Sequence, residues 1–203
     1  MALMTLTEAE KRTVEYYNHT GREWVSKHGG EASQWEEEMK GFMKFLPKGY
    51  VFEIGVGAGK EAKMLMDAGY GYTGIDPSES LLEIAQEVTP HPVFYNGSVY
   101  DIHVWSDCPF DGFWAAASLL HVPKVRIDEA LQNVNSATRK GGIGFISMKE
   151  GVGEIEDETG RTFSYYSQPK FNKILERNGF SILERAKRSE GSLTWLLYYV
   201  SKI

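Results

Sequence analysis

One stretch of the chain constrains its fold more than any other, the run Val51-Phe52-Glu53-Ile54-Gly55-Val56-Gly57-Ala58-Gly59. An apolar strand here enters a glycine-rich turn, and a helical pattern follows. A second apolar stretch ends on an acid in Gly74-Ile75-Asp76-Pro77. In open α/β sheets this arrangement forms a ligand cradle at the carboxyl ends of the strands. The run therefore predicts an α/β protein with a binding site at that edge of the sheet.

The spacing of the glycines separates three kinds of loop. A dinucleotide fingerprint requires glycine where Lys60 stands, and a phosphate-binding P-loop requires glycine at Ile54 and a hydroxyl residue at Glu61. The remaining pattern, E-x-G-x-G-x-G, favours S-adenosylmethionine, which carries an ammonium and a carboxylate but no phosphate. Glu53 is then expected to orient the cationic end, and Asp76 to accept hydrogen bonds from a ribose diol. The alternative is a tight strand-to-helix turn that binds no ligand.

Composition excludes several other classes. The chain has 203 residues and a net charge of −6, which suits one soluble domain and gives no electrostatic footprint for nucleic acid. Its one cysteine, Cys108, offers neither a disulfide nor a metal-ligand cluster, so no metal is expected. No apolar run approaches the length of a membrane span, and the start does not resemble a signal peptide. We expect a cytoplasmic monomer or homodimer that contacts neither membranes nor nucleic acid.

Helical and strand patterns alternate along the chain. Thr7 and Glu10 form a capping-box pattern at the first helix, which Gly29-Gly30 should end, and Ser33 is expected to cap the second. Helices are predicted over about 7–28, 33–46, 60–68, 78–88, 124–138 and 168–178. Strands are predicted over about 50–54, 71–75, 93–96, 110–116, 142–148, 181–189 and 193–200. The last two strands are joined by a tight turn and are expected to pair antiparallel.

Several motifs together resemble one family. Glu53 to Gly59 and Gly74-Ile75-Asp76 resemble its first two motifs, and the segment 110–123, Phe-Asp-Gly-Phe-Trp-Ala-Ala-Ala-Ser-Leu-Leu-His-Val-Pro, resembles its fourth-strand motif. Over about residues 12–200 the chain is similar to small class I S-adenosylmethionine-dependent methyltransferases of the bacterial and archaeal type. The resemblance implies a Rossmann-like three-layer α/β sandwich, with a seven-stranded, mostly parallel sheet and one antiparallel strand. It also implies a single domain, 1–203, made of an N-terminal helical lid (1–48) and a cofactor-binding core (49–203).

The resemblance assigns cofactor contacts residue by residue. Gly55, Gly57 and Gly59 would lie beneath the methionine moiety, and Asp76 would bind the ribose. Further contacts are implied for Pro77 and Ser78 at the adenine, and for Ala117, Ser118 and Leu119 beside the transferable methyl group. Ser98 stands where the family often has an acid that holds the adenine amine. Either the Ser98 hydroxyl and the Val99 amide replace that acid, or Asp101 reaches back.

The implied reaction is methyl transfer to a small-molecule acceptor, with S-adenosylhomocysteine as product. Because the sulfonium is already activated, proximity and orientation supply most of the catalysis, and a base is needed only where the nucleophile loses a proton. His121, just after the fourth strand, is the candidate base; alternatively it only packs against the cofactor or caps the next helix. Two rival functions stay open: a cofactor-binding module without catalysis, and an NAD-dependent oxidoreductase.

Substrate contacts are expected from the N-terminal helix and from the loop after the fifth strand. Tyr16, Tyr17 and Trp24 lie on a helix that covers the cofactor in similar enzymes, and an aromatic ring there can face the sulfonium. The same spacing also places some of these aromatic residues in the core. Arg161 either clamps a substrate carboxylate or phosphate or pairs with the acidic run 154–158, and Tyr165 follows it.

Overall fold

The computed structural model describes residues 6–28, 33–89, 93–105 and 109–203, so Gly29, Gly30 and Cys108 lie outside the described residues. The helices are α1 (Glu8–His28), α2 (Glu36–Phe45), α3 (Lys60–Asp67), α4 (Glu79–Val88), α5 (Ile127–Ala137) and α6 (Gln168–Arg177), with short 3₁₀ helices η1 (Ile102–Trp105) and η2 (Leu119–His121). The strands are β1 (Tyr50–Ile54), β2 (Gly71–Asp76), β3 (Val93–Asn96), β4 (Phe110–Ala115), β5 (Thr138–Lys149), β6 (Glu154–Glu156), β7 (Thr162–Ser164), β8 (Phe180–Glu190) and β9 (Leu193–Lys202).

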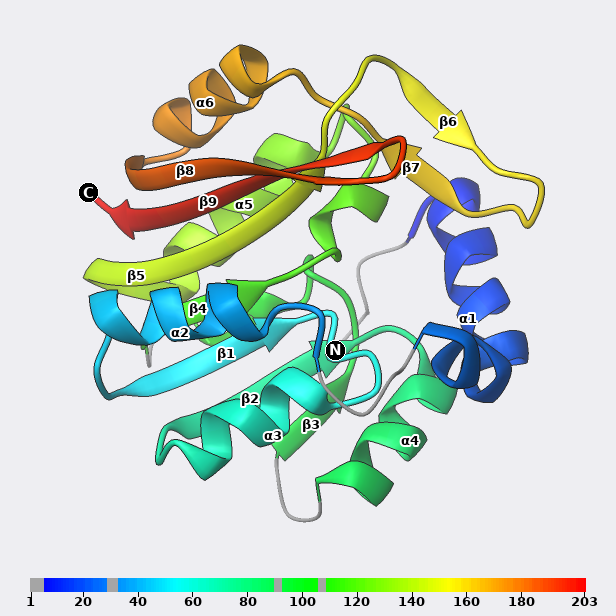
Figure 1. Cartoon of the computed structure of the whole chain (residues 1–203), viewed down its shortest axis with the longest axis horizontal. Coiled ribbons are helices and arrows are strands. Elements are labelled where there is room, and N and C mark those ends of the chain that lie inside the picture. The colour runs from blue at the N-terminus through cyan, green and yellow to red at the C-terminus, as the bar shows by residue number, and fades with distance from the viewer. Residues whose placement is uncertain (1–5, 29–32, 90–92, 106–108) are drawn as a thin grey trace.

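Seven strands form one sheet in the order β3-β2-β1-β4-β5-β9-β8 (Figure 1). Strands β1 to β5 pair in parallel, whereas β9 runs antiparallel to both of its neighbours, β5 and β8. The strand order reverses after β1, between β1 and β4, and ligands of open α/β sheets bind at such a switch point. The predicted mostly parallel sheet with one antiparallel strand is confirmed.

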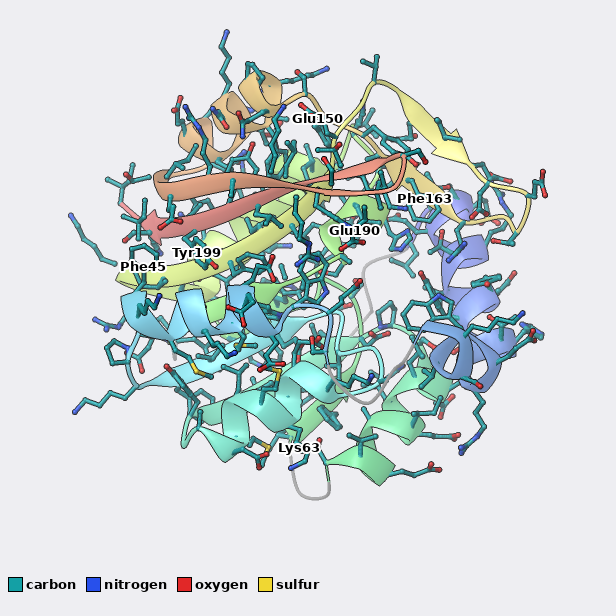
Figure 2. The ribbon with its side chains drawn as sticks, viewed as in Figure 1. Phe45, Lys63, Glu150, Phe163, Glu190 and Tyr199 are labelled. Atoms are coloured by element: carbon teal, nitrogen blue, oxygen red, sulfur yellow. The ribbon has the colours of Figure 1, made fainter. Side chains whose placement is uncertain are left out.

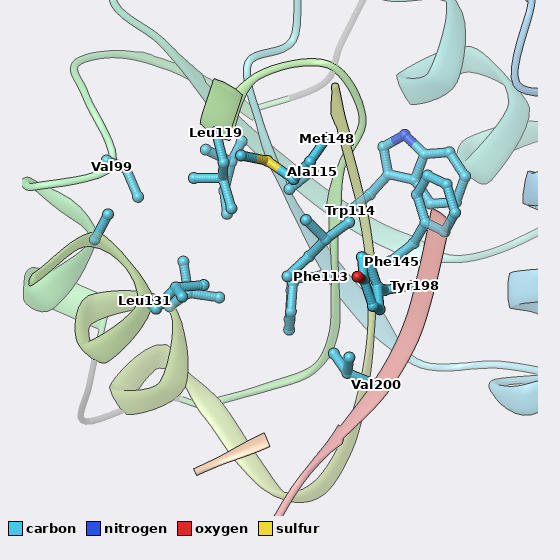
Figure 3. Packing of buried hydrophobic residues seen from close by; sticks show 14 of the residues in the cluster. Val99, Phe113, Trp114, Ala115, Leu119, Leu131, Phe145, Met148, Tyr198 and Val200 are labelled. Atoms are coloured by element: carbon cyan, nitrogen blue, oxygen red, sulfur yellow. The ribbon is translucent and has the colours of Figure 1, made fainter. Parts of the chain in front are cut away.

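A ladder of aromatic side chains fills the space between the sheet and α2. Trp114 of β4, Phe145 of β5 and Tyr199 of β9 occupy paired positions on adjacent strands. Trp114 stacks on Phe145 with ring centroids 4.2 Å apart (Figure 3). Phe42 of α2 meets the Trp114 ring edge to face, with centroids 5.6 Å apart. Such pairs contribute about 0.5–1.5 kcal/mol beyond their buried area. The buried apolar side chains of α2, Met39 and Phe42, therefore belong to the main hydrophobic core.

Helix α1 lies beyond the carboxyl ends of the strands, beside α4 (Figure 1). Its capping box forms as predicted: the Glu10 carboxylate accepts hydrogen bonds from the Thr7 amide and hydroxyl, and the Glu10 amide donates to the Thr7 hydroxyl. Ser33 does not cap α2, because that helix begins at Glu36 and Trp35 is its cap residue. The Ser33 hydroxyl instead accepts from the Trp35 amide and donates to the Glu61 carboxylate.

Two segments differ from the predicted elements. Strand β5 begins at Thr138, directly after α5, and pairs with Phe110 before its register shifts. The segment predicted as a loop after the fifth strand contains a small antiparallel hairpin, in which Ile155 of β6 pairs with Phe163 of β7. This hairpin lies over the end of α1 that carries Arg12, whose guanidinium is 2.6 Å from Glu156.

Candidate active site

A cavity of about 590 Å³ lies at the carboxyl ends of β1, β2, β4 and β5, and α1 covers it. Its size falls within the range of about 300–1,000 Å³ that is typical of small-molecule sites. One end is formed by the glycine-rich loop and the end of β2. The other end is formed by residues of η2, β5, β7 and β9, among them His121, Lys149, Phe163 and Trp195.

The loop after β1 needs glycine for two reasons. Gly55, Gly57 and Gly59 all have positive φ, of 78°, 55° and 76°. A Cβ on Gly55 would also lie 2.5 Å from the Cβ of Ser118, which follows β4. The chain can therefore pass close to the end of β4 only with glycine at position 55. Gly55 and Gly57 line the cavity, whereas Gly59 packs against Ala85 of α4 and joins the loop to that helix.

Asp76 lies at the end of the cavity that the glycine-rich loop forms. Its carboxylate accepts hydrogen bonds from the amides of Gly57, at 2.9 Å, and Ser78, at 2.8 Å, and so links the loop after β1 to the start of α4. Burial raises the pKa of Asp76 to about 6, although both amide hydrogen bonds act in the opposite direction. The carboxylate lines the cavity and has lone pairs left for a diol. Pro77 and Ser78 line the cavity beside it.

Ser98 and Asp101 are bonded to each other. The Asp101 carboxylate accepts from the Ser98 amide and hydroxyl, both at 2.8 Å. Ser98 and Val99 line the cavity, and Asp101 is not among the lining residues. The Ser98 hydroxyl also accepts a hydrogen bond from the Tyr100 amide at 3.3 Å, so Ser98 is held on both sides.

Glu53 lies behind the cavity wall. Its side chain is buried and accepts a hydrogen bond from the Tyr72 hydroxyl at 2.5 Å, and it is not among the lining residues. Burial and the nearby Glu61 carboxylate raise its pKa well above the ordinary value. The carboxyl that does line this part of the cavity is Glu61, whose pKa is also raised by burial.

Backbone strain marks the end of β4. Ala117 has φ of 50°, and its amide donates to the Ser147 hydroxyl of β5 at 2.8 Å. A non-glycine residue in this region costs on the order of 1–3 kcal/mol and occurs at functional sites. Next to it, the buried Ser118 Oγ has no hydrogen-bond partner among the described residues. Ala117, Ser118 and Leu119 all line the cavity.

His121 forms a chain of hydrogen bonds with Tyr17 of α1. Its Nδ1 lies 2.7 Å from the carbonyl of Thr162, so this nitrogen carries the proton. Its Nε2, 3.2 Å from the Tyr17 hydroxyl, is then the acceptor. Burial lowers the pKa of His121 to about 4, and the nearby Lys149 and Arg161 act in the same direction. The imidazole is therefore neutral at physiological pH, and its Nε2 lone pair faces the Tyr17 hydroxyl.

Arg161 is held by the acidic run that precedes it. Its Nη2 lies 2.8 Å from Asp157, and its guanidinium carbon lies 4.5 Å above the Tyr16 ring. Arg161, Tyr17 and Trp24 line the cavity. Tyr16 and Tyr165 are not among the lining residues: Tyr16 supports Arg161 from behind, and Tyr165 packs near Gly151.

The lining residues fit an S-adenosyl group. Asp76 offers acceptors for a diol, Ser98 and Val99 offer a hydroxyl and an amide for an adenine, and the glycine loop leaves room for the backbone to approach. Ser118 also lines the cavity, as do Tyr17 and Trp24, whose rings meet edge to face. No three His, Cys, Asp or Glu side chains of the described ranges converge as metal ligands would.

Comparison with known proteins agrees with this geometry. The family model of a methyltransferase domain matches residues 51–142, from β1 to the start of β5. An uncharacterized methyltransferase of Staphylococcus carnosus is 30% identical over 140 residues, which are 68% of this chain and 65% of that protein. One of Alkaliphilus oremlandii is 26% identical over 140 residues, 69% of this chain and 59% of that protein. The chain thus spans less than two thirds of these relatives.

Residues 51–142 match the methyltransferase-domain family, and the chain has the fold of the class I methyltransferases. Its fold is shared by the 1,6-didemethyltoxoflavin-N1-methyltransferase of Burkholderia thailandensis, solved with S-adenosylhomocysteine, at a TM-score of 0.78 and 17% identity over 100% of this chain and 93% of that one. The [4+2]-cyclase SpnF has the same fold, at a TM-score of 0.79 and 15% identity over 100% and 99%. At such identities the likeness concerns the fold alone, and this fold carries more than one activity.

The candidate site contains residues that sequence reasoning did not select. Lys149, Phe163, Trp35 and Trp195 all line the cavity, and Glu61 replaces Glu53 on its wall. Lys149 ends a strand and Phe163 lies in the unpredicted hairpin, so no periodic pattern marks them as neighbours. The only available signal was that Lys149 is a charged residue directly after the buried run of β5.

Proposed function

We propose that the protein transfers a methyl group from S-adenosylmethionine to a small molecule bound between α1 and the carboxyl ends of β4 and β5. This proposal rests on one observation: the same cavity is lined by Asp76 and the glycine loop, by Ala117 and Ser118, and by the hydrogen-bonded pair of His121 and Tyr17. A cofactor and an acceptor held at the two ends would meet at the strained end of β4.

The cofactor, when bound, supplies an activated methyl group on a sulfonium. Asp76 would hold the ribose hydroxyls, the hydroxyl of Ser98 would contact the adenine amine, and the amide of Val99 would donate to a ring nitrogen of the adenine. Helix α1 covers the cavity and would exclude water from it. The hydrogen bond from Ser78 Oγ to Asn18 and the Glu10–Arg126 ion pair hold this helix in place. Correct orientation of this kind is worth roughly 7–11 kcal/mol in favourable cases.

His121 would accept the proton of an acceptor that has to lose one. The Tyr17 hydroxyl donates to His121 Nε2, so Tyr17 can take the acceptor's proton on its oxygen while passing its own to the imidazole. The product is the methylated acceptor, S-adenosylhomocysteine and an imidazolium that returns the proton to solvent. Burial raises the pKa of Tyr17, which keeps the phenol protonated and able to relay.

The proposal is tested by incubating the protein with methyl-labelled S-adenosylmethionine and a bacterial extract that has been separated into small molecules, protein and nucleic acid. We expect label only in the small-molecule fraction, and less label with the His121→Gln variant. Label in protein or nucleic acid would contradict a small-molecule acceptor. Tight binding of S-adenosylmethionine with no label in any fraction would favour a binding module, or a reaction other than methyl transfer.

A further inference from the structure

Lys149 carries a charge that no described residue neutralises. It is the last residue of β5 and lines the cavity, and its Nζ lies 3.8 Å from the centroid of the Phe163 ring and 6.0 Å from that of Trp195. No carboxylate of the described residues lies within salt-bridge distance of this ammonium. Lys187 of β8, in the same sheet, differs from Lys149 because its ammonium is paired with Glu150 at 2.6 Å.

The other charged groups that face this end of the cavity already have partners. Arg161 is bonded to Asp157, and Glu190 lies 3.1 Å from Arg188 and accepts a hydrogen bond from the indole of Trp195. Burial, together with the positive Arg161, lowers the pKa of Lys149, and Asp157 offsets this only in part. A half-buried ammonium beside a second cation is therefore poised to gain from a negative charge placed in the cavity.

The side chains around Lys149 are aromatic. Trp35 and Trp195 meet edge to face with centroids 5.1 Å apart, and Phe163 lies beneath the ammonium. Figure 2 shows Phe163 and Glu190 at the end of the sheet that faces α1. Rings of this kind bind a planar apolar body by stacking or by edge contacts. A single uncompensated positive charge suits a monoanion better than a dianion.

We infer that Lys149 determines acceptor specificity by pairing with the carboxylate of an aromatic acid. This inference rests on the proposed function, since it names the class of molecule that the acceptor end of the cavity receives. The carboxylate would lie between Lys149 and the Arg161 side of the cavity, with the ring against Phe163 and Trp195. The group that receives the methyl then faces Ser118 and Tyr17.

Binding of simple probes tests the inference without knowledge of the natural acceptor. Benzoate and its neutral isostere benzamide are titrated into protein saturated with S-adenosylhomocysteine, and binding is followed by the fluorescence of the cavity tryptophans. We expect benzoate to bind at least about tenfold more tightly than benzamide, a difference of about 1.4 kcal/mol. Lys149→Met should abolish that preference and leave benzamide binding unchanged, whereas Lys149→Arg should retain it.

Lys187→Met is the matched control, because this neighbouring lysine is exposed and paired outside the cavity. It should preserve the preference for benzoate. Equal binding of the two probes to the wild-type protein, no binding of benzoate, or a preference that survives Lys149→Met would each overturn the inference. The affinity for S-adenosylhomocysteine is measured in every variant. If that affinity is absent, the proposed function fails; if it is intact while the preference is absent, only the inference fails.

Discussion

At the scale of single residues, the site depends on close approach between the loop after β1 and the end of β4. Gly55 and Ser118 are separated by 63 positions in the chain, yet no Cβ fits between them. The glycine pattern predicted the loop correctly, because a positive φ has a clear signature in sequence. The unpartnered Ser118 hydroxyl and the strained Ala117 had no such signature, since they arise from how β4 meets β5 and the loop.

The first prediction concerns Gly55→Ala. The added methyl group meets the Ser118 side chain, and the φ of 78° disfavours any residue with a Cβ by about 1–2 kcal/mol. We expect the affinity for S-adenosylhomocysteine, measured by calorimetry, to fall at least about tenfold. Gly69→Ala is the control, because Gly69 has a φ of 85° but open space around it. Unchanged affinity in Gly55→Ala would show that the loop does not need this approach.

At the scale of elements, one carboxylate of α1 makes several of the contacts that fix this helix to the core. Glu10 caps its own helix and also accepts a hydrogen bond from the Tyr100 hydroxyl at 2.5 Å, and it pairs with Arg126 at 3.1 Å. The Arg126 guanidinium in turn lies 3.4 Å above the Tyr100 ring. Sequence reasoning predicted the capping box but not these tertiary partners, because they lie 90 and 116 positions away along the chain.

The second prediction is that Glu10→Ala lowers the free energy of unfolding by about 2 kcal/mol, because it removes the acceptor from two buried donors. Unfolding in urea measures this. The matched control is Glu8→Ala in the same helical turn, where the pair with Lys11 is exposed and screened by solvent, so a much smaller loss is expected. Equal losses in both variants would mean that Glu10 acts only through helix propensity.

The hairpin of β6 and β7 shows where sequence patterns stop being informative. Each strand has three residues, and Glu154-Ile155-Glu156 is exposed throughout, so neither strand has a periodicity to detect. Yet this hairpin supplies Phe163 to the cavity and carries the Thr162 carbonyl that orients His121. Both the tautomer of the candidate base and the surroundings of Lys149 therefore depend on an element that only the fold reveals.

At the scale of the whole molecule, the sequence motifs predicted the sheet and its cofactor edge, because each motif lies at the end of a buried strand. None of the described helices has the length and apolar character needed to cross a bilayer. The motifs did not predict that Lys149 and Phe163 join Tyr17 and His121 at the acceptor end, where four different elements meet. The division into a lid, 1–48, and a core, 49–203, stays a prediction.

The third prediction is a dependence of stability on pH. The pKa of His121 falls from about 6.5 in the unfolded chain to about 4 in the folded protein. Between these values the unfolded chain holds more protons, so His121 destabilises the fold progressively as the pH falls. Asp76, whose folded pKa of about 6 exceeds its unfolded value, acts in the opposite direction between about pH 4 and 6.

Comparison of His121→Gln with the wild-type protein isolates the histidine, because other titrating groups contribute equally to both. The variant's loss of stability at neutral pH should shrink as the pH is lowered from about 6.5 to 4, by at most about 3 kcal/mol. Urea unfolding at a series of pH values measures the difference. A difference that does not vary with pH would mean that His121 titrates normally in the folded protein.

The most direct test of the central claim is a calorimetric titration with S-adenosylmethionine, S-adenosylhomocysteine and NAD. We predict binding of both sulfur compounds in the micromolar range, no binding of NAD, and at least a tenfold loss of affinity, about 1.4 kcal/mol, in Asp76→Ala. Asp67→Ala serves as the control, because Asp67 is exposed and pairs only with Lys63. Binding of NAD alone, no binding of either sulfur compound, or full affinity in Asp76→Ala would contradict the account.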